Sequence, residues 1–305
     1  MFRVSMISLA VWLSSGDVVS ADVSGEQPVV PETLWEAWNW DLLILLNLSV
    51  LASWYLLGIN RLWRRTGSKR RVGRVQAVAY LSSLGVLLVA LISPLHALSE
   101  ELASAHMVQH MLLMVVAAPL FVLGSPGLVL MCGLAPQWRP VVAGWRRWVD
   151  ADVLRRPLLP SVLYAVALWI WHLPIAYEAA LVDPLVHDVE HLSFFAAACL
   201  YWRALLDQLR RRALHPLTAV MIHFLTSLHA MVLGVFMALA PTVWYEAYAS
   251  RTTTWGLTPL EDQQLAGLIM WLPACLIYPA VAAAALGHWL AALSESHPRS
   301  TGQPA

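Results

Sequence analysis

Long apolar stretches alternate with short polar segments along most of this chain. Seven stretches contain about the 20 predominantly apolar residues that an α-helix needs to cross a bilayer, or come close to that length. They occupy residues 40–59, 75–93, 106–124, 158–172, 187–202, 217–239 and 264–286. The runs are continuous and lack the alternation of a barrel strand. The sequence therefore predicts an all-α, polytopic membrane protein with seven transmembrane helices, of which the fifth is the least apolar.

The composition agrees with a membrane protein. Hydrophobic residues make up 59% of the 305 residues and charged residues only 12%. Soluble domains contain about 45–50% apolar and about 25% charged residues. One core could not bury this excess, so a lipid bilayer must surround much of the surface. The composition excludes a soluble enzyme, a disordered chain and a nucleic-acid-binding protein.

Basic residues predict the orientation of the bundle. Residues 61–74 contain seven Arg or Lys, residues 139–156 contain five, and residues 203–212 contain four. The alternate connections contain only Arg251. Because basic connections are retained in the cytoplasm, we expect a multi-pass protein of the bacterial inner membrane. Its N-terminus is predicted outside and its C-terminus in the cytoplasm.

The two ends of the chain predict segments outside the bundle. Residues 1–21 have a short apolar core and small residues before Ala21, which is typical of a cleaved signal peptide. An uncleaved first span is the alternative. Residues 22–39 are predicted to be an exposed periplasmic segment, residues 40–287 the transmembrane domain, and residues 288–305 a cytoplasmic tail.

Two histidine pairs begin predicted spans on the outer side. His106 and His110 open the third span, and His187 and His191 open the fifth. A separation of four residues places both imidazoles of a pair on one helix face. We expect the pairs to converge on one pocket in the outer leaflet. Neutral imidazole binds copper, zinc, iron and nickel.

Four further residues are candidate ligands of the same pocket. His172 ends the fourth span on the outer side, and His229 lies slightly outward of the middle of the sixth. Met107 and Met111 follow the first histidine pair, and thioethers favour Cu(I). Copper is therefore the first candidate metal, with His106, His110, His187 and His191 ahead of His172 and His229 as its ligands.

Acidic residues are predicted to support these ligands. Glu190 or Asp188 is expected to accept the second ring N–H of a ligand histidine and so fix its tautomer. Asp262 precedes the last span together with a pair of glutamines. It either caps that helix or helps to hold the outer pocket.

Three other interpretations use the same histidines. Residues 187–191 match the H-x-x-E-H pattern of inverted zincins, but the edge of a span gives a peptide little access, so no catalytic residue is predicted. Histidines on facing helices could instead bind a b-type haem in a membrane electron carrier. They could also only tie helices together in a scaffold without a metal.

The chain contains several motifs in and beside the predicted spans. The first is His106-Met-Val-Gln-His110-Met-Leu-Leu, followed by Ala-Pro119-Leu and Leu-Gly124-Ser-Pro126. The others are Trp171-His172-Leu-Pro174, His187 and His191 with Trp202, His229, and Asp262-Gln-Gln-Leu-Ala-Gly267 with Trp271. Over about residues 40–285, these motifs together resemble the CtaG family of caa-type cytochrome c oxidase assembly factors.

The resemblance implies a non-enzymatic role in assembling a haem–copper terminal oxidase, at the step that supplies the CuA or CuB copper. Subunits of cytochrome c oxidase would then be the partners. Many members carry a further histidine shortly after the position of His191, where this chain has Ser193. If that histidine is a ligand, the site here has one imidazole fewer.

Overall fold

The structure is a computed structural model that describes residues 29–66, 72–140, 144, 156–211 and 216–296. The predicted signal peptide, residues 1–21, lies outside the described residues. The described part contains helices and no strands, which confirms the all-α prediction. The main helices are α2 (Leu42–Thr66), α3 (Arg74–Ile92), α4 (Pro94–Glu101), α5 (Ala103–Met111), α6 (Ala118–Leu123), α7 (Pro126–Gly133), α10 (Leu158–Trp171), α11 (Pro174–Val182), α12 (Pro184–Arg211), α13 (Pro216–Ala238) and α14 (Pro259–Ser296).

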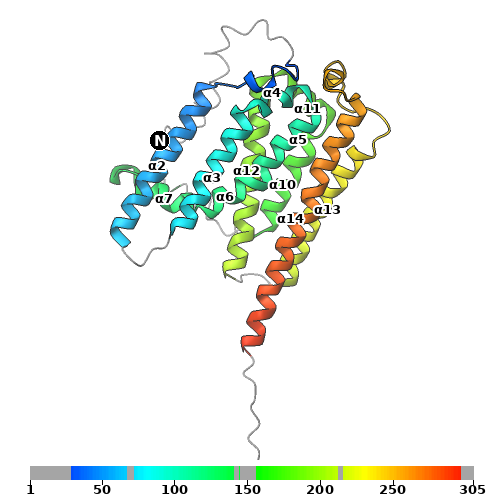
Figure 1. Cartoon of the computed structure of the whole chain (residues 1–305). Helices are drawn as coiled ribbons and strands as arrows, with labels where there is room; N and C mark the ends of the chain where they lie inside the picture. The colour runs from blue at the N-terminus through cyan, green and yellow to red at the C-terminus, as the bar shows by residue number, and fades with distance from the viewer. Residues whose placement is uncertain (1–28, 67–71, 141–143, 145–155, 212–215, 297–305) are drawn as a thin grey trace, which may run out of the picture.

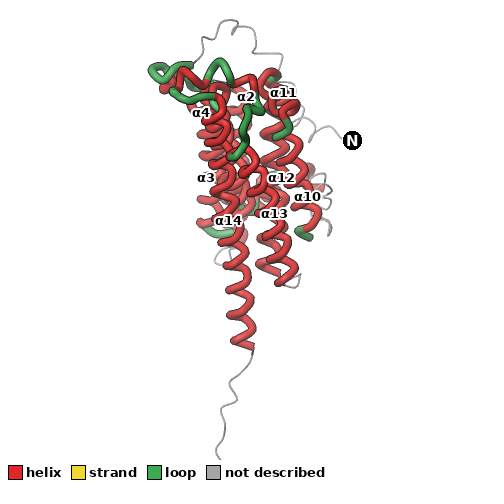
Figure 2. The backbone as a smooth tube through the Cα atoms, turned by 90° about the vertical axis from the view of Figure 1, so that its right-hand side faces the viewer, coloured by secondary structure: helices red, strands yellow, loops and turns green. Residues whose placement is uncertain are grey.

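The long helices run side by side in one bundle (Figure 1). The short helices α4 and α11 lie at the same end of the bundle in both views (Figures 1 and 2). Helix α14 extends beyond the others at the opposite end and continues to Ser296, past the predicted end of the transmembrane domain at residue 287. The end that carries α4 and α11 corresponds to the predicted outer side.

The described helices give five or six candidate spans where the sequence predicts seven. Five are long and apolar enough: Leu42–Arg65, Arg74–Ile92, Ala103–Leu123, Val220–Ala238 and Pro259–Val281. Helices α10 and α11 form a sixth only if they are taken together, and they are bent by 74° at their junction. Helix α12, which contains the fifth predicted stretch, has the length of a span. It is less apolar because histidines and acids occupy its first turns.

The third predicted span contains a π-helical segment directly after the first histidine pair. Residues Leu112–Ala117 form this segment between α5 and α6. Such segments leave backbone groups without their usual partners within the helix. The Trp202 indole donates a hydrogen bond to the carbonyl oxygen of Met114 (2.8 Å), and the Ser83 hydroxyl donates to that of Ala117 (2.8 Å). Side chains of α12 and α3 therefore stabilise the irregular segment that follows His110.

Helices α13 and α14 pack closely at glycines. A Cβ atom added at Gly267 would lie 2.6 Å from the carbonyl oxygen of Gly234 and would also collide with the backbone nitrogen of Ala238. Backbone atoms cannot move aside as the end of a side chain can. The absence of a side chain at Gly267 therefore permits this close contact between the two helices.

Replacement of Gly267 by valine should destabilise the α13–α14 pair. Overpacking of this kind typically costs about 1–3 kcal/mol, so we expect a lower midpoint of thermal unfolding for the purified protein in detergent. Gly287→Val on the same helix is the matched control, because an added Cβ there meets nothing within 4 Å. Equal midpoints for the two variants would contradict this packing.

Candidate metal centre

Four buried side chains from two helices meet near the predicted outer end of the bundle. His106 and His110 lie one turn apart on α5, and Glu190 and His191 are neighbours on α12. Each offers one nitrogen or oxygen atom, and these four atoms all lie within 4.8 Å of one another. All four residues are buried. We call this group the buried centre.

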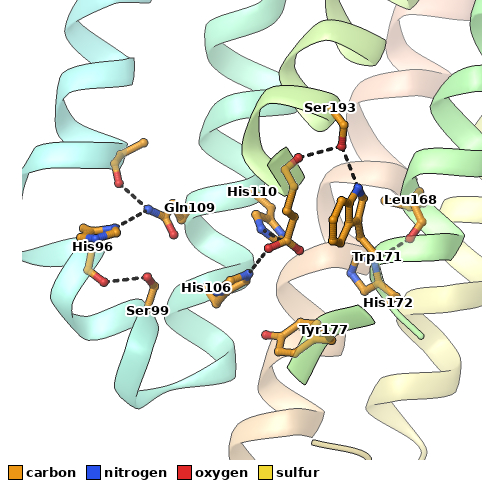
Figure 3. A network of polar contacts seen from close by, with 12 residues as sticks. His96, Ser99, His106, Gln109, His110, Leu168, Trp171, His172, Tyr177 and Ser193 are labelled. Atoms are coloured by element: carbon orange, nitrogen blue, oxygen red, sulfur yellow. Dashed lines mark hydrogen bonds and ion pairs between the residues drawn. The ribbon is translucent and has the colours of Figure 1, made fainter. Parts of the chain in front are cut away.

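The Glu190 carboxylate lies between the two imidazoles of α5. Its Oε2 atom is 3.5 Å from Nε2 of His106, and its Oε1 atom is 3.5 Å from Nε2 of His110 (Figure 3). These distances exceed the usual N–H···O hydrogen bond of about 2.7–3.2 Å. An ion held tetrahedrally by bonds of about 2.0–2.1 Å places neighbouring ligand atoms about 3.4 Å apart. The spacing therefore suits atoms that share an ion.

The rings of the three histidines are close together as well. The ring centroids of His106 and His110 are 4.2 Å apart, and those of His110 and His191 are 5.4 Å apart. The ring of Phe194 lies 4.7 Å from that of His110 and is fully buried. The centre thus has an apolar wall, where electrostatic interactions are stronger than in water.

Many polar atoms in and around the centre have no hydrogen-bond partner within the described part of the chain. A buried polar atom without a partner costs roughly 1–3 kcal/mol, and a charged one costs more. The atoms are both ring nitrogens of His106 and His110, both carboxylate oxygens of Glu190, and Nε2 of His172, His187 and His191. An ion bound at the centre would provide a partner for four of them.

His187 and His172 flank the centre without joining its four-atom group. The ring centroid of His187 is 4.1 Å from that of His191 and 5.4 Å from that of His106. The ring of His172 lies 6.4 Å from that of His110, and its Nδ1 is 2.7 Å from the carbonyl oxygen of Leu168. His172 is therefore held by its own helix, with Nε2 left free.

His229 is not one of the four residues of the buried centre, and the two methionines pack in or against the apolar core. The ring of His229 has Tyr164 as its neighbour, with centroids 6.3 Å apart. Met107 is fully buried in the apolar core, and Met111 packs against that core. A role of either thioether as a ligand of the ion stays a prediction.

The two acidic residues lie differently with respect to the histidines. Glu190 is predicted to accept the second ring N–H of a ligand histidine, and its carboxylate lies 3.5 Å from Nε2 of His106 and of His110, among the candidate ligand atoms. Asp188 is half-buried and makes no hydrogen bond or ion pair with the histidines that the structure describes. Ser193, two positions after His191, accepts a hydrogen bond from the Trp171 indole (2.7 Å). Its hydroxyl donates to the carbonyl oxygen of Glu190 (2.9 Å).

Asp262 caps the helix that carries the first histidine pair. Its Oδ2 accepts from the backbone N–H of Ala103 (2.6 Å), and its Oδ1 accepts from the N–H and the hydroxyl of Ser104 (3.1 and 2.5 Å). A carboxylate at this place satisfies free N–H groups and interacts favourably with the helix dipole. Asp262 therefore positions His106 and His110 from α14, although it does not contact them.

A group of tyrosines covers the outer side of the centre. The ring of Tyr177 lies 5.0 Å from that of His106 and stacks on Tyr245, with centroids 3.9 Å apart. Tyr248 donates its hydroxyl hydrogen to the carbonyl oxygen of Ser99 (2.9 Å). Burial raises the pKa of Tyr245 and of Tyr248 above its ordinary value, so both hydroxyls remain protonated. Sequence reasoning missed this cover, since nothing in the spacing of the tyrosines indicates it.

His96 on α4 is a neighbour of the centre that sequence reasoning also missed. Its ring stacks on that of His187, with centroids 5.7 Å apart. Its Nδ1 is 3.3 Å from the side-chain nitrogen of Gln109 (Figure 3). Burial, and secondarily the nearby His106, lowers the pKa of His96 to about 4, so the ring is neutral at pH 7.

Comparison with known proteins identifies the family. The family described as cytochrome c oxidase caa3 assembly factor (Caa3_CtaG) matches residues 53–292, most of the chain. This chain belongs to that family. The matched residues include every residue of the buried centre.

Curated relatives of the chain include mycobacterial proteins. An uncharacterized protein of Mycobacterium bovis is 27% identical over 259 residues, which cover 80% of this chain and 38% of that protein. An uncharacterized protein of Mycobacterium leprae is 25% identical over 284 residues, which cover 87% of this chain and 42% of that protein. The chain thus spans about two-fifths of the length of these relatives. No solved structure matches the chain.

Removal of the Asp262 carboxylate should destabilise the start of α5. Loss of a helix cap costs roughly 0.5–2 kcal/mol, and buried donors left without an acceptor add to this cost. We therefore expect Asp262→Ala to lower the free energy of unfolding by at least about 2 kcal/mol. Asp188→Asn should change it by less than about 0.5 kcal/mol. Chemical denaturation in detergent measures both, and similar values for the two variants would refute the capping role.

Proposed function

We propose that this chain binds copper at the buried centre and takes part in this way in the assembly of a haem–copper cytochrome c oxidase. The observation that supports the proposal is the group of three imidazoles and one carboxylate, with ligand atoms within 4.8 Å of one another. The family supplies the context, since cytochrome c oxidase caa3 assembly factors serve an oxidase that contains copper. Oxidase subunits would be the partners.

The donor atoms fit a copper ion. Imidazole nitrogens bind copper, zinc, iron and nickel, and sites with nitrogen and oxygen ligands bind Cu(II) more tightly than the other divalent first-row metals. Three neutral histidines and one carboxylate could hold the ion by four bonds. The protein would do no chemistry on the ion at this centre. His106, His110, Glu190 and His191 would hold it and shield it from water.

A b-type haem fits these residues less well. The four candidate ligand atoms lie too close together to leave room for a planar macrocycle between them. The rings of Tyr177 and Phe194 pack directly against His106 and His110. A compact ion is the ligand that this spacing favours.

The geometry argues against a protease site at the H-x-x-E-H pattern. That mechanism needs His187 and His191 as joint ligands, with Glu190 free to activate a water molecule. Here the Glu190 carboxylate contacts the imidazoles of α5, and His187 stays outside the four-atom group. A non-enzymatic role agrees with the family to which the chain belongs.

The copper content of the purified protein tests the proposal. We expect about one copper ion per wild-type chain and a loss of at least tenfold in affinity in Glu190→Gln, because the neutral amide is a far weaker ligand. The double variant His106→Ala/His110→Ala should retain no copper at this centre. Elemental analysis gives the stoichiometry, and the nitrogen couplings in the electron paramagnetic resonance spectrum of Cu(II) report the bound imidazoles.

His229→Gln is the control, since this histidine lies away from the centre. It should bind copper as the wild type does. In cells, oxidase activity of the membranes should fall with Glu190→Gln and not with His229→Gln. Copper binding that is equal in all variants would overturn the proposal. Normal oxidase assembly in the variants without copper would favour a scaffold that needs no metal.

A further inference from the structure

Two half-buried histidines connect the buried centre with the edge of the protein. His187 lies one turn before His191 on α12, with ring centroids 4.1 Å apart. His96 on α4 stacks on His187 at 5.7 Å. The side chain of His96 is 20% exposed, and Glu100, whose Oε1 is 3.8 Å from Nε2 of His96, is 52% exposed. Imidazoles thus follow one another from the surface to the centre.

The described side chains on the other sides of the centre are closed to solvent. Tyr177 and Tyr245 are stacked above His106 and are 1% exposed each. Phe194 packs against His110 and is fully buried. A hydrated ion could approach from these sides only by displacing packed aromatic rings. The side with His96 and His187 offers metal ligands instead.

We propose that His96 and His187 form an outer pair that passes copper to the buried centre. The inference rests on the proposed function, because it assigns the route by which that centre is filled. Transfer is ligand exchange: a bond from the ion to His187 forms as the bond to His96 breaks, and bonds to His191 and His106 then replace the one to His187. The ion keeps its charge, and no electron is transferred.

The hydrogen bonds of His96 suit a ligand that must release its ion. The Gln109 amide donates to the carbonyl oxygen of Ala90 (2.7 Å) and to Nδ1 of His96 (3.3 Å). Since a carbonyl oxygen can only accept, this contact fixes which end of the amide faces His96. Nδ1 is then an acceptor, and the proton of the neutral ring is on Nε2.

Copper binding by His96 therefore costs a hydrogen bond. The ion must either replace the Gln109 amide at Nδ1, or bind Nε2 while the ring proton moves to Nδ1 and breaks the same contact. Within the described part of the chain, the ring nitrogens of His106 and His110 make no hydrogen bond that the ion would have to replace. Affinity for the ion should consequently rise from the outer pair to the buried centre. Copper bound first at His96 would move inward and remain there.

The rates of copper binding and release test this route. Purified full-length protein in detergent is mixed with Cu(II) glycinate, and the spectrum of the buried centre is followed by freeze-quench electron paramagnetic resonance. We expect His96→Gln and His187→Gln to slow loading at least tenfold. Release to an excess of chelator should slow by the same factor, because a residue on the route affects both directions equally.

The final copper content and the final spectrum should stay unchanged in both variants. Replacement of a residue that only supports the fold would instead alter the content or the spectrum. His229→Gln is again the control and should load at the wild-type rate. Unchanged rates in both variants would overturn the route, as would loss of the bound copper itself, which would make the residue a permanent ligand. If the wild type binds no copper, the proposed function fails and this inference fails with it.

Discussion

The burial of a carboxylate among imidazoles is the constraint on which this structure depends. Glu190 is fully buried, and a charge taken out of water is costly unless nearby groups compensate for it. The described groups that face its oxygens are Nε2 of His106 and of His110. Helices α5 and α12 must therefore keep a fixed rotation about their axes and a fixed offset along their axes relative to each other. An ion at this place would relieve the same constraint, since it supplies a positive charge beside the Glu190 carboxylate.

Segments far apart in the sequence hold these two helices in register. Asp262 fixes the start of α5 from α14, and Trp202 and Ser83 satisfy the π-helical segment that follows His110. Close packing at Gly267 in turn holds α14 against α13. The centre is therefore built from two helices and kept in place by three others. A substitution at a distance of several turns can displace the ligands without touching them.

Sequence patterns predict the helical membrane bundle well, because the length and apolarity of a run indicate a membrane helix without any knowledge of its neighbours in the fold. The same patterns count α12 among the ordinary spans. The residues that form the centre make its first turns polar, so this helix is less apolar than a typical span. The pairing of His106 with His110 follows from helix geometry. Successive residues are about 100° apart around a helix, so Met107 does not share the face of His106 and His110.

Other features of the centre depend on tertiary structure. Nothing in the sequence shows that Glu190 faces His106 and His110 across the helix interface, since this requires the relative rotation of α5 and α12. The place of His96 beside His187 depends on the turn between α3 and α4. The tyrosine cover depends on how residues 239–258 fold back over the bundle. Asp262 caps a neighbouring helix, whereas a sequence pattern can reveal only a cap on its own helix.

X-ray absorption at the copper edge of the copper-loaded protein tests the central claim most directly. Three imidazoles and one carboxylate predict a shell of nitrogen and oxygen atoms at about 2.0 Å, with the outer-shell scattering that imidazole rings produce. A dominant sulfur shell at about 2.3 Å, or a spectrum of aqueous copper without imidazole scattering, would contradict the account.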